Sequence, residues 1–328
     1  MDLGLNGRVT LVAASSRGLG RAIATAFAAE GAKVMISARD EAALAQTAEE
    51  IREATGAEVD YYATDLTRVD DIRALVKRTA ERFGGVDVLL PNAGGPPAGS
   101  FDTVSDEDWR GAFELNLMSV VRLVREVLPY MREKGFGRIV NVASSSIKQP
   151  IEDLILSNTF RAGVAGLAKS LSFELASDDI LVNTLGPGRI STERSASIDV
   201  AQAERLGVSV AEVRGGVESR IPLGRYGSPE EFARVAVFLA SPANIGVQKY
   251  KTNRATVSRC AQQRRERRAF RAGGSWLDVG FPKRSCFAGR YGIACTSPPS
   301  TCKETPVIYD AAGESRKVAA RPSSSGLP

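Results

Sequence analysis

Short apolar runs alternate with amphipathic segments over the first 240 residues or so of this chain. Nearly continuous apolar runs predict buried strands. They lie at residues 8–14, 33–38, 58–65, 86–94, 137–144 and 180–188. Segments with helical spacing, such as that of Ile23 and Phe27, predict helices. They lie at residues 18–30, 41–54, 69–83, 157–176 and 229–240, with a further helix of about 20 residues starting at Asp106. This alternation predicts a parallel sheet covered on both faces, a doubly wound α/β domain of the Rossmann type.

The composition changes near residue 245. From Gly246 onward, 16 Lys and Arg face 5 Asp and Glu, a surplus of 11 positive charges. Because the whole chain carries +5, the preceding part carries −6. Gly, Pro and Ser make up about 28% of this stretch, near the range of disordered segments. We therefore expect one folded domain over residues 1–245 and a disordered basic tail over residues 246–328.

The tail also contains every cysteine of the chain: Cys260, Cys286, Cys295 and Cys302. Their spacing matches no zinc or disulfide pattern, so no metal site is predicted. The basic run at residues 264–268 could contact nucleic acid, but a solvated charge run is the favoured interpretation. No apolar run approaches the roughly 18 residues of a membrane span. The N-terminus shows no signal peptide, so a cytoplasmic protein is expected.

Polar and glycine-rich motifs follow four of the predicted strands. AASSRGLGR, at residues 13–21, joins the first strand to the first helix. Such a turn lets the backbone approach a pyrophosphate at a helix N-terminus. SAR, TDL and PNAG end the second, third and fourth strands. Open α/β sheets bind ligands at these carboxyl ends, so the four motifs together predict a nucleotide site.

In combination and order, these motifs resemble the short-chain dehydrogenases/reductases, especially the bacterial 3-oxoacyl-[acyl-carrier-protein] reductases. SSRGLG is similar to the family's TGxxxGxG loop, PNAG to NNAG, and NTLGPGRIST to NxxxPGxxxT. RYGSPEEFARVAVFLASP is similar to the family's penultimate helix, and the resemblance covers about residues 5–243. It implies hydride transfer between NAD(P) and a small carbonyl or alcohol substrate. It also implies a dimer or tetramer of identical subunits if the C-terminus were intact. The substrate itself is not indicated by any motif.

The resemblance also implies a set of cofactor-binding residues. They are Ser15, Arg17, Gly18, Leu19, Gly20, Arg39, Asp65, Leu66, Asn92, Ala93, Gly94, Pro187, Gly188, Ile190 and Thr192. Ala38 and Arg39 stand where an NAD enzyme commonly offers an acid to the ribose, and Arg17 adds a second cation. Two guanidinium groups suit a 2'-phosphate, which favours NADP over NAD. In the alternative interpretation, Arg39 is solvent-facing and pairs with Asp40.

The family's catalytic tetrad of Asn, Ser, Tyr and Lys is altered here. Asn116 matches the Asn and Ser144 the Ser, with Ser145 as the alternative position. Ser157 and Arg161 occupy the Tyr and Lys positions. An aliphatic hydroxyl is a far weaker acid than a phenol, and arginine is effectively never deprotonated.

The chain contains no histidine, and the best candidate for a replacement acid is Lys148 in SSSIKQP, near the expected mouth of the site. In the alternative interpretation, Lys148 is a solvated loop lysine. Ala13 and Ala14 replace the Thr and first Gly of the cofactor loop, and Pro91 replaces the first Asn of NNAG. Two functions remain open. The first is an NADP-dependent oxidoreductase with an atypical tetrad, and the second is an NADP-binding sensor or partner-binding protein without redox turnover.

The family also places a last strand, with a pattern like TGxxxxVDGG, soon after the helix that matches residues 229–240. Here the sequence continues as GVQKYKTNRATVSRC, so this edge strand is missing. We interpret the change near residue 245 as translation in a shifted reading frame, with a genuine basic extension as the alternative.

Overall fold

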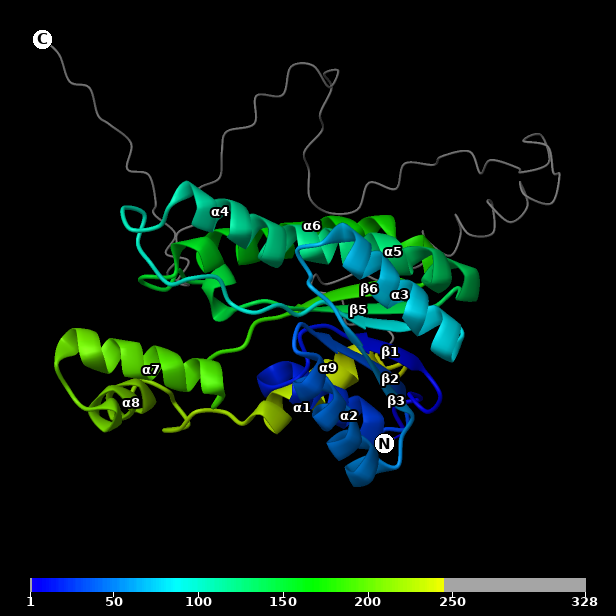
Figure 1. Cartoon of the computed structure of the whole chain (residues 1–328), viewed down its shortest axis with the longest axis horizontal. Coiled ribbons are helices and arrows are strands. Elements are labelled where there is room, and N and C mark those ends of the chain that lie inside the picture. The colour runs from blue at the N-terminus through cyan, green and yellow to red at the C-terminus, as the bar shows by residue number, and fades with distance from the viewer. Residues whose placement is uncertain (1, 245–328) are drawn as a thin grey trace, which may run out of the picture. The chain divides into compact units, whose positions relative to one another are not determined.

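The computed structural model describes residues 2–244. Within them, six strands form one sheet in the order β3-β2-β1-β4-β5-β6 (Figure 1). The strands are β1 (Val9–Val12), β2 (Lys33–Ala38), β3 (Val59–Ala63), β4 (Val88–Leu90), β5 (Gly137–Val142) and β6 (Ile180–Leu185). All neighbouring pairs are parallel, which confirms the predicted Rossmann-type fold. The strand order reverses between β1 and β4, and open sheets of this kind bind ligands at that point.

Helices cover both faces of the sheet. One face packs against α1 (Gly18–Ala29), α2 (Glu41–Thr55) and α9 (Pro229–Ala240). The other packs against α3 (Val69–Phe83), α5 (Ser119–Lys134) and α6 (Ile155–Glu174). The remaining helical elements are α4 (Asp106–Phe113), the π-helical turn η1 (Glu114–Met118), η2 (Ser145–Ile147), η3 (Ala176–Asp178), α7 (Glu193–Leu206) and α8 (Val210–Glu218). In Figure 1, α7 and α8 lie at one end of the sheet, where the chain leaves β6.

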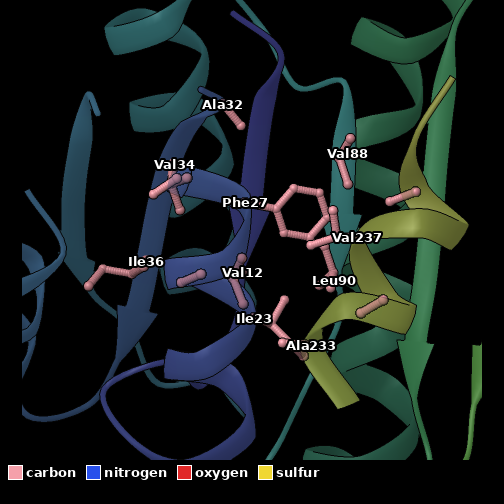
Figure 2. Packing of buried hydrophobic residues seen from close by; sticks show 14 of the residues in the cluster. Val12, Ile23, Phe27, Ala32, Val34, Ile36, Val88, Leu90, Ala233 and Val237 are labelled. Carbon is pink, nitrogen blue, oxygen red and sulfur yellow. The ribbon is translucent and has the colours of Figure 1, made fainter. Parts of the chain in front are cut away.

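The core on the first face centres on α1. Phe27 and Ile23 are fully buried, and Figure 2 shows them between the strands and the alanine-rich face of α9. Ala233 and Val237 supply that face, so the two helix backbones pack closely. Truncating a buried Phe to Ala costs about 3–5 kcal/mol, so this packing holds the turn from β1 into α1 firmly in place.

Several predicted boundaries differ from the structure. The first strand ends at Val12, because Ala14 adopts a left-handed backbone with φ 48° and breaks the extended run. The helix predicted from Asp106 continues through η1 to Lys134 and is therefore longer than expected. Helix α6 spans 155–174 instead of 157–176. Helices α7 and α8 occupy a segment for which the sequence predicted no element.

The predicted disorder of the basic tail, its four cysteines and the missing edge strand all concern residues outside the described part. The shifted reading frame therefore stays a prediction, and translating the other frames of the gene beyond codon 245 tests it directly. Within residues 2–244, no helix has both the length and the apolar composition needed to span a bilayer.

Candidate active site

The turn between β1 and α1 is a close backbone approach. Gly18 has φ 56°, and a Cβ added at Gly20 would lie 2.2 Å from the carbonyl oxygen of Ala14. Only glycine fits at position 20, so the chain can enter α1 directly above the sheet edge. Arg17, the N-cap residue of α1, makes no side-chain cap hydrogen bond. The N-terminal amides of this helix are thus left for an anion, as a dinucleotide turn requires.

Side chains join the ends of three strands around this turn. The Ser15 hydroxyl is buried; it donates to the Val12 carbonyl (2.7 Å) and accepts from the Ser37 amide (3.0 Å). Asn92, after β4, donates from Nδ2 to the Ala14 carbonyl (3.1 Å). These contacts make Ser15 and Asn92 structural parts of the cofactor loop.

Arg39 is exposed at the end of β2, on the side predicted for the ribose. Its expected alternative partner, Asp40, instead caps α2 by accepting from the Ala43 amide (3.1 Å). Partial burial opposes ionisation of Asp65, yet two hydrogen bonds from Thr67 and the nearby charge of Arg39 hold its pKa below the usual value. Arg39 and Asp65 therefore share this end of the site. Leu66, also predicted as a cofactor residue, is buried in the core.

The start of α7 reaches both loops that border the site. The Glu193 carboxylate lies 3.2 Å from the Arg17 guanidinium, and both side chains are largely exposed. Thr192 caps α7 within a capping box. Arg194 donates to the Pro96 carbonyl (3.1 Å) in the loop after β4. Sequence reasoning missed Glu193 and Arg194, although they directly follow the Thr of the recognised NTLGPGRIST motif.

Two members of the predicted tetrad occupy the same edge of the sheet. Asn116 is fully buried in the π-helical turn; its Nδ2 donates to the Gly94 carbonyl (2.8 Å), while its Oδ1 has no protein partner. Ser144, just beyond β5, accepts from the Ser146 amide (3.1 Å) and caps η2. The alternative residue, Ser145, is exposed.

Arg161 binds the protein backbone in place of a carboxylate. Its Nη1 donates to the Val142 carbonyl (2.7 Å) and its Nη2 to the Ala93 carbonyl (3.1 Å), so one side chain joins the ends of β4 and β5. Burial lowers the pKa of Arg161 to about 10, which leaves it charged at neutral pH. This cation is held in place and cannot relay a proton.

Ser157 lies half-buried on α6, one helical turn before Arg161. Lys148 is exposed at the end of η2. The structure thus brings Asn116, Ser144 and Arg161 to the carboxyl ends of β4 and β5.

The residues present fit an elongated ligand along this edge. A Cβ added at Gly94 or Gly188 would meet nothing within 4 Å, so open space lies beside both loops. The Pro187 carbonyl accepts from the Ser145 amide (3.1 Å) and ties the segment after β6 to the serine run. Ile190 packs against the core. With no side-chain cap at the α1 N-terminus and no protein partner for Asn116 Oδ1, this edge suits a dinucleotide.

Comparison with known proteins identifies the family. The profile of the family described as Enoyl-(Acyl carrier protein) reductase matches residues 13–249. The chain belongs to the short-chain dehydrogenase/reductase family. It is 35% identical over 240 residues to the 3-oxoacyl-[acyl-carrier-protein] reductase FabG of Vibrio cholerae, covering 73% of this chain and 92% of that relative.

Two solved structures are similar along the same region. A variant of actinorhodin polyketide ketoreductase with NADPH shares 38% identity at a TM-score of 0.71, over 74% of this chain and 93% of that one. L-sorbose reductase from Gluconobacter frateurii, complexed with NADPH and L-sorbose, shares 34% identity at a TM-score of 0.71, over 74% and 92%. Both similar structures contain NADPH.

Proposed function

We propose that this protein is an NADP(H)-dependent oxidoreductase that acts on a small carbonyl or alcohol substrate with an altered proton donor. The observation that carries the proposal is the placement of Arg17 and Arg39 beside the β1–α1 turn, where two guanidinium groups suit a 2'-phosphate. The NADPH in both similar structures supports the same cofactor. Family resemblance further supports a homo-oligomer in the cytoplasm. Light scattering on the purified protein tests the oligomeric state.

Each group of site residues has a separate role in this proposal. The Gly-rich turn, Arg39 and the 187–192 segment would hold NADP(H), which supplies or accepts the hydride when bound. Ser144, together with Ser157 on α6, would hold the substrate oxygen. Asn116 and Arg161 fix the surrounding backbone through the Gly94, Ala93 and Val142 carbonyls.

Proton transfer is the weak step. A phenol has a pKa near 10, whereas the pKa of a serine hydroxyl is about five or more units higher and closer to that of water. That difference corresponds to on the order of 7 kcal/mol of lost driving force. Ser157 is therefore a poor acid, and we propose slow turnover on simple ketones. Lys148 is the replacement acid to test first.

The second candidate function is an NADP-binding protein without redox turnover, a sensor or partner-binding protein. The observation that favours it is Arg161, whose guanidinium is engaged by two backbone carbonyls. The cofactor site would then remain while the proton path is lost.

Fluorescence titration with NADPH and NADH, followed by NADPH oxidation across a panel of ketones, tests both candidates. The proposal expects tighter NADPH binding and slow but measurable oxidation. Arg39→Asp should remove the preference for NADPH, whereas Arg110→Asp, an exposed change on α4, should not. Binding without any oxidation favours the second candidate, and equal affinities for the two cofactors contradict the NADP assignment.

A further inference from the structure

A buried polar cluster lies outside the tetrad, where α7 contacts the segment that precedes it and the segment that follows α8. The Tyr226 hydroxyl lies 3.1 and 3.0 Å from the two carboxylate oxygens of Asp199 on α7. Asp199 is 1% exposed and Tyr226 5% exposed. Arg189 lies 3.7 Å from the same carboxylate, and the Arg214 guanidinium of α8 lies over the Tyr226 ring.

The backbone around this cluster forms a second connection between the same segments. The Ser191 amide donates to the Gly227 carbonyl (2.9 Å), and the Gly227 amide donates to the Arg189 carbonyl (3.0 Å). Residues 189–191 and 226–227 are therefore paired side by side. Two contacts therefore fix the segment that leads from β6 into α7. They are the backbone pairing with residues 226–227 and the ion pair between Arg189 and Asp199.

A buried carboxylate is retained in a fold only when hydrogen bonds or an opposite charge offset its desolvation. Here the Tyr226 hydroxyl supplies the hydrogen bond and Arg189 supplies the opposite charge. These two residues come from the two segments that the cluster joins. Burial, followed by the hydrogen bond to Asp199, raises the pKa of Tyr226, so the phenol stays protonated and keeps donating. The cluster is thus a permanent link at neutral pH and not a proton source.

We infer that the Tyr226–Asp199–Arg189 cluster positions the 187–192 segment against the nicotinamide end of the cofactor, and that Tyr226 and Asp199 are positioning residues for hydride transfer. The inference rests on the proposed function and on the resemblance of residues 183–192 to the family's NxxxPGxxxT segment, which closes over the nicotinamide. Arg189 belongs to the segment itself, and Thr192 within it begins α7. Loss of the link to Asp199 would therefore displace the segment. We expect little effect on the Gly-rich turn and Arg39, because the Glu193–Arg17 ion pair that joins α7 to this turn is exposed and weak.

The test compares two ligands on Tyr226→Phe. This variant keeps the ring beneath Arg214 and removes only the hydroxyl. The ligands are NADPH and adenosine 2',5'-bisphosphate, which carries the 2'-phosphate but no nicotinamide. We expect NADPH affinity to fall about 5- to 10-fold, the scale of one lost hydrogen bond, while affinity for the bisphosphate stays the same. Tyr130→Phe, which removes a hydroxyl on α5, should change neither affinity.

Asp199→Asn should weaken NADPH binding to a similar extent. Combining it with Tyr226→Phe should add little, because both changes break the same link. If Tyr226→Phe does not fold, Arg189→Gln takes its place, because it leaves the Tyr226–Asp199 hydrogen bonds intact. Lower affinity for NADPH with unchanged affinity for the bisphosphate would support the inference, and unchanged affinity for both would overturn it.

The remaining outcomes are distinguishable. Unchanged NADPH affinity in a folded Tyr226→Phe protein overturns the inference, as does an equal loss for both ligands, since a general loosening of the fold would explain it. Failure of the unmutated protein to bind either ligand would instead overturn the proposed function.

Discussion

The Glu193 carboxylate forms an ion pair with the Arg17 guanidinium across 176 positions of sequence, at 3.2 Å. Arg17 belongs to the cofactor turn and Glu193 to the first turn of α7. A 2'-phosphate that binds Arg17 must therefore compete with a carboxylate of the same chain. Since both side chains are largely exposed, the ion pair is weak, and a phosphate with more than one negative charge can displace it.

Glu193→Gln should raise NADPH affinity, because it removes the competing charge from Arg17. Exposed pairs contribute about 0.2–1 kcal/mol, so a gain of up to about 5-fold is expected. NADH, which lacks the 2'-phosphate, should gain little. Glu204→Gln, an exposed change near the other end of α7, is the matched control. Fluorescence titration at low salt measures the effect, and an equal gain for NADH would contradict it.

Restoring the family's acid should raise turnover and lower stability together. In Ser157→Tyr with Arg161→Lys, a phenol and an ammonium return to the tetrad positions, and a positioned general acid contributes on the order of 10²-fold or more in rate. A lysine cannot bridge both the Val142 and Ala93 carbonyls, and a buried carbonyl left unpaired costs about 1–3 kcal/mol. NADPH oxidation and thermal unfolding measure the two effects. A double variant that folds but gains no activity would show that more than these two residues is altered.

Ala14→Gly should stabilise the protein. Ala14 holds φ 48°, and a left-handed backbone costs a residue with a Cβ about 1–2 kcal/mol that glycine does not pay. A gain of about 1 kcal/mol in the free energy of unfolding is expected. Ala13→Gly is the control, because Ala13 is buried and outside the left-handed region, so the same change should destabilise. Urea unfolding compares the two, and destabilisation by both would show that the backbone at Ala14 is not strained.

The loop before α9 should lose stability in acid. Nη1 and Nη2 of Arg225 donate to the Glu231 carboxylate (2.9 and 2.7 Å), and with hydrogen bonding from Ser228 they lower the pKa of Glu231 from 4.5 to about 2. A lowered carboxyl pKa stabilises the fold above the unfolded value, and this contribution disappears as pH falls from 4.5 towards 2. Glu231→Gln should therefore be less stable than the unmutated protein at pH 6, and the two should converge towards pH 2. A constant difference over this range would contradict the assignment.

Sequence patterns predicted the scaffold well because they depend on local periodicity and on strand ends. The six strands, the Gly-rich turn and the position of Asn92 beside it all follow from those two rules. The left-handed backbone of Ala14 escaped prediction, since alanine rarely adopts it. The hydrogen bonds of the Ser15 hydroxyl with the Val12 carbonyl and the Ser37 amide are not revealed by any linear motif, and the assignment of Ser15 to the cofactor stays a prediction.

Long-range contacts account for most of the rest. Arg161 binds the Ala93 carbonyl, which is 68 residues away in the sequence. The arginine side chain, longer than that of lysine, reaches this carbonyl only because α6 packs against the sheet. The Tyr226–Asp199 contact joins residues 27 apart, and Asp199 lies in a segment with no recognised motif. Helices α7 and α8 were missed for the same reason, although Thr192 and Ser209 each begin a capping box.

The π-helical turn at Glu114–Met118 sets the rotational register between α4 and α5. A π turn holds one residue more than the α-helix that surrounds it, and each helical residue advances the chain by about 100°. On α4, the ring of Trp109 lies with its centroid 5.6 Å from that of Phe160, while α5 packs against the sheet. Because of the extra residue, the orientation of α4 about its axis does not follow from that of α5. Deleting a single residue from this turn would leave both helices intact as helices. It would also rotate Asn116 away from Gly94, so the turn works as a one-residue spacer between the packing of α4 and the packing of α5.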